Sequence, residues 1–226
     1  MNKRILLLGD SLGMPTGKNE ITYEDTYPYI LSKGMKDFEV VSRHRRTNDT
    51  TQQLKYQFIF DDVEMMNPDY MVIHLGIVDC SPRLFSRFQN AAIRKLPNSL
   101  SKSIIKVFSK YRYFITKTFP KVYVSKQQYE INLNKFIQLS VEFNITPIFI
   151  EILQTSKDNN KKSFNFQKNI NQYNEILKRI TQENKINIIK YKIPNTYLLD
   201  DGIHITKEAN LYIAEQIQIM IENDLC

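Results

Sequence analysis

The stretch ILLLGDSLG, residues 5–13, decides the fold class of this chain of 226 residues. Its first four residues are apolar and end at Gly9, a pattern typical of a short strand buried on both faces. Such strands belong to parallel sheets that helices cover on both sides. In those sheets ligands bind where the strands end, so Gly9-Asp10-Ser11 is the first place to look for a site.

The rest of the chain alternates short apolar runs with longer amphipathic stretches. Four further runs predict strands at residues 38–42, 70–75, 147–153 and 186–191. The stretches between and after them predict helices at residues 26–35, 50–66, 125–143, 164–183 and 206–222. A parallel pair of strands needs a crossover long enough to hold a helix, so this order predicts an α/β fold with a five-stranded parallel sheet. The length fits one domain over residues 1–226.

Two short motifs carry residues suited to nucleophilic catalysis. Ser11 follows the first strand, although a serine at a turn more often only caps it. Asp201-Gly202-Ile203-His204 follows the last predicted strand. A serine hydroxyl needs a general base to attack a carbonyl, and a histidine base needs an anion to fix its tautomer. Ser11, His204 and Asp201 are therefore candidate nucleophile, base and orienting acid.

Gly9-Asp10-Ser11-Leu12 and Asp201-x-x-His204, at opposite ends of the chain, together resemble the blocks of the SGNH/GDSL hydrolase superfamily. The resemblance implies a flavodoxin-like three-layer α/β/α fold with Ser11, Asp201 and His204 as a catalytic triad. The three histidines are scattered without ligand spacing, so no metal site is expected, and no cofactor is predicted. A looser similarity of residues 76–83 to a variant third block suggests members linked to bacterial surface polysaccharide.

Two departures from the family pattern affect the oxyanion hole. The third block, Gly76-Ile77-Val78-Asp79, has valine where the family has an asparagine donor, and the second block contains no glycine. Asn48 aligns best with that missing glycine. We therefore expect the oxyanion or the substrate to be bound by a different set of residues, with the candidates Asn48, Gly76, Asp79, Arg45 and Arg46.

A basic segment interrupts the alternation. Between Cys80 and Tyr129 the chain carries eleven Lys and Arg and no Asp or Glu, while the whole chain has a net charge of +7. Apolar residues recur within it at helical spacing, so we predict an inserted helical lid or subdomain at residues 81–124. Three interpretations of this segment are compatible with the sequence: it is a solvated lid without a partner, it binds an acidic glycan, or it binds an anionic membrane surface. Nucleic acid is disfavoured, because no DNA- or RNA-binding motif accompanies the charge.

Other functional classes find no support in the sequence. No apolar run approaches the roughly 20 residues of a membrane span, and Ile5–Leu8 is too short for the core of an export signal. Cys80 and Cys226 form no disulfide or metal spacing, and Cys80 is expected to be a small buried residue. These features favour the cytoplasm, with peripheral membrane contact as an option.

Three functions are compatible with the motifs. The first is a serine-dependent ester hydrolase, acting through an acyl-enzyme on Ser11 and removing acetyl groups from carbohydrate. The second is a sugar O-acyltransferase with the same triad, since only the access of water to the acyl-enzyme distinguishes the two. The third is a non-catalytic protein that binds a glycan or a membrane.

Overall fold

The computed structural model describes residues 3–17, 20–191 and 196–225. Within them, one sheet has the strand order β2-β1-β3-β4-β5, and all its pairings are parallel. Its members are β1 (Lys3–Gly9), β2 (Phe38–His44), β3 (Tyr70–His74), β4 (Thr146–Ile150) and β5 (Asn187–Ile189). The predicted parallel sheet of five strands is confirmed, and the apolar run that opens the chain is β1, next to the centre.

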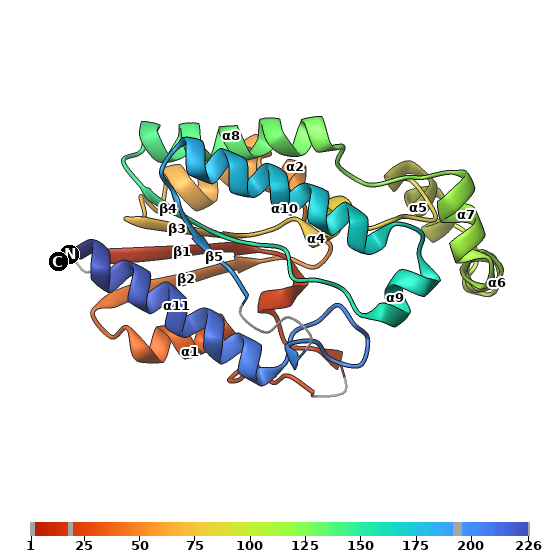
Figure 1. Cartoon of the computed structure of the whole chain (residues 1–226), viewed down its shortest axis with the longest axis horizontal. Helices are drawn as coiled ribbons and strands as arrows, with labels where there is room; N and C mark the ends of the chain where they lie inside the picture. The colour runs from red at the N-terminus through yellow and green to blue at the C-terminus, as the bar shows by residue number, and fades with distance from the viewer. Residues whose placement is uncertain (1–2, 18–19, 192–195, 226) are drawn as a thin grey trace.

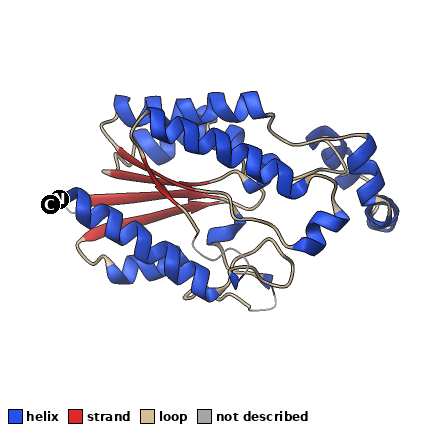
Figure 2. Cartoon of the chain, viewed as in Figure 1, coloured by secondary structure: helices blue, strands red, loops and turns tan. Residues whose placement is uncertain are grey.

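Helices cover both faces of the sheet, which gives three layers (Figures 1 and 2). One face carries α1 (Tyr27–Gly34) and α11 (Lys207–Leu225), and the other carries α8 (Lys126–Glu142) and α10 (Phe166–Glu183). The core explains why β1 and β3 are apolar on both sides: Ile5, Leu6, Leu7 and Leu8 are at most 1% exposed. The predicted α/β/α fold class is confirmed.

The prediction of one helix over residues 50–66 is wrong. The segment folds as α2 (Thr50–Gln53), α3 (Tyr56–Ile59) and a π-helical turn η3 (Phe60–Glu64). The break lies at Lys55, whose backbone is extended with φ −68° and ψ 140°. Buried Gln53 accepts hydrogen bonds from the side chains of Asn48 and Arg45, and these contacts fix α2 against the preceding loop. Tertiary contacts therefore override the helical periodicity.

Residues 81–124 carry three helices, α5 (Arg87–Arg94), α6 (Asn98–Lys110) and α7 (Arg112–Thr118). They lie at the edge of the molecule beyond the carboxyl ends of the strands (Figure 1). The short helix α4 (Ile77–Cys80) leads into them, and α9 (Lys157–Lys162) lies on the same side of the molecule. Cys80 is fully buried, as predicted, whereas Cys226 lies outside the described residues. None of the described helices has the length and apolar content that a membrane crossing requires.

Candidate active site

The nucleophile candidate sits on a tight turn over the end of β1. Ser11 begins the single-turn helix η1 (Ser11–Gly13), and the side chain of Asp10 caps it by accepting a hydrogen bond from the N–H of Leu12 at 2.9 Å. Asp10 and Leu12 are almost completely buried, so the turn is fixed from below while Ser11 stays partly accessible. The first N–H groups of a helix have no acceptor within it, so the N–H of Ser11 is a candidate donor for an oxyanion.

The structure brings together the three residues that the sequence predicts as a triad. Nε2 of His204 lies 3.1 Å from Oγ of Ser11, and Nδ1 of His204 lies 2.5 Å from Oδ2 of Asp201. The other carboxylate oxygen of Asp201 accepts from the N–H groups of Ile203 and His204, each at 2.9 Å. A carboxylate on Nδ1 keeps the proton there and leaves Nε2 free to accept one from the serine.

The charge of Asp201 suits this arrangement. Partial burial raises the pKa of Asp201, but the hydrogen bonds from the side chain and backbone of His204 and from the N–H of Ile203 outweigh it and lower the pKa below its usual value. The residue is therefore an anion at neutral pH, able to stabilise a protonated His204. The positive φ of Gly202, +67°, lets the chain reverse between the two residues.

A buried carboxyl group lies beneath the nucleophile. Burial raises the pKa of Asp10 to about 7, against the lowering effect of the Leu12 N–H and of the charges of His204 and Arg83. Oδ2 of Asp10 has no hydrogen-bond partner in the described part of the chain. Its position beside Ser11 was not predicted as part of the site; the aspartate of the Gly-Asp-Ser block was the only available signal.

His44 is a second feature that the sequence did not reveal. A Cβ atom on either Gly9 or Gly13 would overlap the His44 ring, so the ring packs directly against both ends of the serine turn. His44 belongs to a chain of hydrogen bonds that runs inward from exposed Ser42 through His44 to Tyr27, which in turn contacts His74 in the interior. Burial lowers the pKa of both histidines to about 3, which keeps them neutral.

The predicted oxyanion role of Asn48 does not fit the structure. Its side-chain amide donates to the carbonyl of Gly9 at 3.1 Å and to Oε1 of Gln53 at 2.8 Å, and its N–H donates to the carbonyl of Arg45 at 3.3 Å. The residue is only 3% exposed. These donors therefore hold the second-block loop against β1 instead of facing a substrate.

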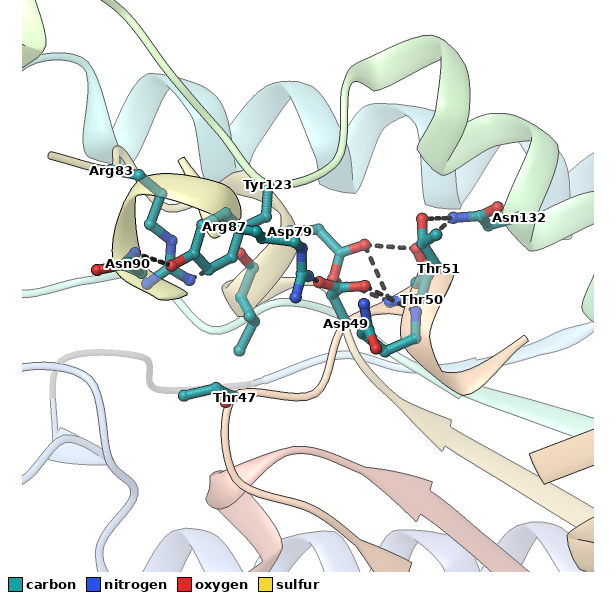
Figure 3. Close-up of polar contacts among 12 residues, drawn as sticks. Thr47, Asp49, Thr50, Thr51, Asp79, Arg83, Arg87, Asn90, Tyr123 and Asn132 are labelled. Atoms are coloured by element: carbon teal, nitrogen blue, oxygen red, sulfur yellow. Dashed lines mark hydrogen bonds and ion pairs between the residues drawn. The ribbon is translucent and has the colours of Figure 1, made fainter. Parts of the chain in front are cut away.

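Asp79 and Arg45 also serve the interior. Asp79 is completely buried and accepts hydrogen bonds from the N–H and hydroxyl of Thr50 (Figure 3), and burial raises the pKa of Asp79 to about 7. Arg45 pairs with Asp62 at 2.7 Å and lies over the ring of Phe58. These contacts give both side chains a structural role.

Gly76 lies at the start of α4, and Arg46 lies at the rim of the site. Gly76 has φ +135°, and a Cβ atom there would overlap Ile152, so glycine is required for the close packing that starts α4. Arg46 donates to the carbonyl of Pro15 at 2.9 Å and lies beside His204 at the rim of the site. Of the five candidates for oxyanion or substrate binding, Arg46 is the one whose side chain lines the hollow next to the triad.

That hollow has a volume of about 420 Å³. It is lined by Thr16, Gly17, Glu20, Arg46, Asp200, Asp201 and His204. A second hollow of about 210 Å³ is lined by Thr47, Arg87, Asn90, Ala91, Arg94 and Tyr123. Figure 3 labels four of these residues, Thr47, Arg87, Asn90 and Tyr123. Large apolar side chains are missing from the described lining of the first hollow, and its polar groups suit a ligand rich in hydroxyl groups.

The second hollow is formed by contacts between the insertion and the core. Arg87 of α5 lies over the ring of Tyr123, 4.4 Å from its centre, and forms an ion pair with the buried carboxylate of Asp49 (Figure 3). Asn90 donates to the hydroxyl of Tyr123 at 2.8 Å. In the described residues no group of three or more His, Cys, Asp or Glu side chains is placed to hold a metal.

Comparisons with known proteins identify the fold. No family model and no curated protein matches the chain. Among solved structures, a lipase/acylhydrolase from Enterococcus faecalis aligns with TM-score 0.68 and 13% identity over 98% of this chain and 96% of its own. The acetyl xylan esterase AlAXEase aligns with TM-score 0.63 and 15% identity over 96% and 99%. A GDSL-like lipase from Bacteroides thetaiotaomicron aligns with TM-score 0.63 and 16% identity over 99% and 89%.

The chain therefore has the fold of the SGNH/GDSL hydrolases. The resemblance predicted from residues 9–12 and 201–204 is confirmed at this level, since each neighbour is covered almost from end to end.

Proposed function

We propose that this protein is a serine-dependent ester hydrolase that acts through an acyl-enzyme on Ser11. The observation that carries the proposal is the continuous hydrogen-bonded series from Ser11 through His204 to Asp201 at the carboxyl edge of the sheet. Residues 193 positions apart in sequence meet there with the geometry that general-base catalysis needs. A non-catalytic scaffold has no need for this alignment.

The reaction follows from the geometry in two steps. Nε2 of His204 takes the hydroxyl proton of Ser11 as Oγ attacks the ester carbonyl carbon. The developing oxyanion is stabilised by the N–H of Ser11, and His204 returns the proton to the leaving alcohol oxygen as the ester bond breaks. Water, deprotonated by His204, then attacks the acyl-enzyme and releases the acid, while the Asp201 carboxylate stabilises the protonated imidazole in each step.

Water is the acceptor that the structure favours. The side chains of His204 and Asp201 are 27% and 50% exposed, so solvent reaches the base directly. None of the described residues between 81 and 124 lines the hollow beside His204. An acyltransferase must protect its acyl-enzyme from water, and nothing covers this site in the described structure. These observations support hydrolysis over transfer to a sugar hydroxyl.

The polar hollow supports a carbohydrate ester with a short acyl group as the substrate. Charged and hydroxyl side chains around His204 can donate to and accept from sugar hydroxyls, whereas a long acyl chain would find no apolar surface there. The fold shared with an acetyl xylan esterase is consistent with this class. We therefore propose O-acetylated carbohydrate as the substrate class, with Arg46 contacting the sugar.

The test is hydrolysis of p-nitrophenyl esters of increasing chain length by the wild-type protein, Ser11→Ala and the control Ser99→Ala. We expect the rate with the acetate ester to fall by about 10³-fold or more in Ser11→Ala. Ser99, on an exposed turn of α6, should be replaceable without effect. A fluorophosphonate should label the wild type at Ser11, and acetate should be preferred to octanoate. Equal rates for wild type and Ser11→Ala would refute the proposal.

A further inference from the structure

The insertion exposes an unusual number of large apolar side chains. Phe88, Val107, Phe114 and Phe119 are each more than half exposed, and Leu100 and Ile105 are each 48% exposed. All six lie within the three helices or at their ends, at the edge of the molecule in Figure 1. Scattered exposed apolar residues are normal on a protein surface, but a concentration of this kind marks an interaction site.

Helix α6 shows the pattern most clearly. Leu100, Ile104, Val107 and Phe108 are spaced i, i+4, i+7 and i+8, so they share one face of the helix. An amphipathic helix normally buries such a face against the core, yet no residue of α6 is buried. One contact, between the rings of Phe108 and Phe85 at 4.8 Å, ties this face to the rest of the insertion.

The charges of α6 lie beside and behind this apolar face. Lys102, Lys106 and Lys110 follow one another at i, i+4 and i+8; Lys102 lies opposite Leu100, and Lys110 borders the apolar face next to Val107. The surrounding chain from Ser81 to Gln128 adds further Lys and Arg and contains no acidic residue. An apolar stripe with lysines on the polar face is the arrangement by which helices lie in the interface of a membrane.

The insertion is held firmly at its base. Arg112 donates to the carbonyl of Pro82 at 2.9 Å and to Oγ of Ser163 at 2.6 Å, and the ion pair of Arg87 with Asp49 ties α5 to the core. The apolar face of α6 is therefore presented by an anchored structure. Helix α6 lies at the outer edge of the molecule, beyond the carboxyl ends of the strands (Figure 1).

We propose that α6 and the adjoining helices dock on an anionic lipid surface, with the apolar face of α6 inserted between the headgroups and the lysines against lipid phosphates. The charge argues for this occupant. A second copy of the chain would bring two strongly basic segments together without an acidic residue in either. An acidic glycan would pair with the lysines but leave Leu100 and Val107 in water. An anionic membrane would both pair with the lysines and bury the apolar side chains.

The test is flotation of the full chain with vesicles of phosphatidylcholine, with and without phosphatidylglycerol, at low and high salt. We expect binding only with the anionic lipid, and weaker binding at high salt. Leu100→Ser with Val107→Ser, and separately Lys102→Glu with Lys106→Glu, should each weaken binding about tenfold or more, equivalent to roughly 1.4 kcal/mol. Val141→Ser with Lys135→Glu, on exposed positions of α8, is the matched control and should bind as wild type does.

Three results would overturn the proposal. The first is equal binding of the wild type and both insertion variants, and the second is no binding of the wild type to anionic vesicles. The third is a wild-type oligomer that Leu100→Ser with Val107→Ser converts to a monomer without vesicle binding, which would assign the face to a second copy. Ser11→Ala should bind vesicles like the wild type, so the outcome is independent of the proposed esterase activity.

Discussion

The Asp10–Gly13 turn rests on the buried core, whereas the Asp201–His204 turn is held by hydrogen bonds, both within its own loop and from Thr155, Ser156 and Asn159. Under the first turn, the His44 ring fills the space that Gly9 and Gly13 leave open. In the second, the carboxylate of Asp201 accepts from two backbone N–H groups within three residues of itself. Packing positions the nucleophile, while hydrogen bonds to the backbone and carboxylate of the turn position the base.

The two turns also treat their carboxyl groups differently. Burial raises the pKa of Asp10 to about 7, whereas the hydrogen bonds of the loop lower the pKa of Asp201. A buried group is sensitive to any change in the volume around it, and an exposed one is sensitive mainly to its direct partners. Changes at the nucleophile turn should therefore affect stability and activity together, and changes at the histidine turn should affect activity alone.

The largest effect is expected for Asp201→Asn. An asparagine keeps an oxygen for the two N–H groups of the turn but removes the charge that holds the proton on Nδ1 of His204. We expect kcat/KM for an acetate ester to fall by roughly 10³–10⁴-fold, with the free energy of unfolding changed by less than about 0.5 kcal/mol. Steady-state kinetics and urea unfolding measure the two quantities. If the free energy of unfolding fell by as much as the loss of kcat/KM corresponds to, the two turns would not differ in the way proposed.

Gly13→Ala should affect both properties. The added methyl group overlaps the His44 ring, which is itself fixed by hydrogen bonds, so the turn must shift. We expect a destabilisation of about 1–3 kcal/mol and a fall in kcat of about 10², the cost of displacing a reacting group by roughly 1 Å. Thermal unfolding and ester hydrolysis provide the measurement.

A double-mutant cycle identifies the cause. His44→Ala opens the space that the new methyl group needs, so Gly13→Ala should cost about 1 kcal/mol less in the His44→Ala background than in the wild type. Strict additivity of the two unfolding free energies would show that the turn is not controlled by this packing contact.

The sequence predicted the meeting of Ser11, His204 and Asp201 because both motifs follow strands, and the carboxyl ends of parallel strands lie at one edge of the sheet. It did not predict the directions of Asn48, Arg45 and Asp79. Those side chains form hydrogen bonds or ion pairs inside the protein, with Gln53, Asp62 and Thr50 as partners. Partners of this kind come from tertiary packing between distant segments, and no local pattern encodes them.

The dependence on tertiary packing also explains why the exposed apolar face of the insertion could not be predicted from the sequence. Its helical spacing and its charge were visible in the sequence, but a helical pattern does not show whether its apolar face is covered. The exposure of Leu100 and Val107 became evident only from the arrangement of α5, α6 and α7. Likewise, the ion pair of Arg87 with Asp49 joins two segments whose proximity depends on how the insertion is anchored.

The pH dependence of stability sharpens the contrast between buried and exposed carboxyl groups without affecting the catalytic residues. Asp79 has a pKa of about 7 in the folded protein and about 3.8 as a free side chain, because it is fully buried. Between these values the folded state holds a proton that the unfolded state has lost, so raising the pH from about 4 to about 7 favours unfolding. In Asp79→Asn this contribution disappears, while an oxygen remains for Thr50.

We therefore expect Asp79→Asn to gain stability relative to the wild type between pH 5 and pH 7, by on the order of 2 kcal/mol. His44 and His74, whose pKa values are about 3, act in the opposite direction between about pH 3 and pH 6.5, but they do so in both proteins and cancel in the difference. Urea unfolding of both proteins at the two pH values measures the change. A pH-independent difference would mean that Asp79 is ionised throughout, as Asp201 is, despite its complete burial.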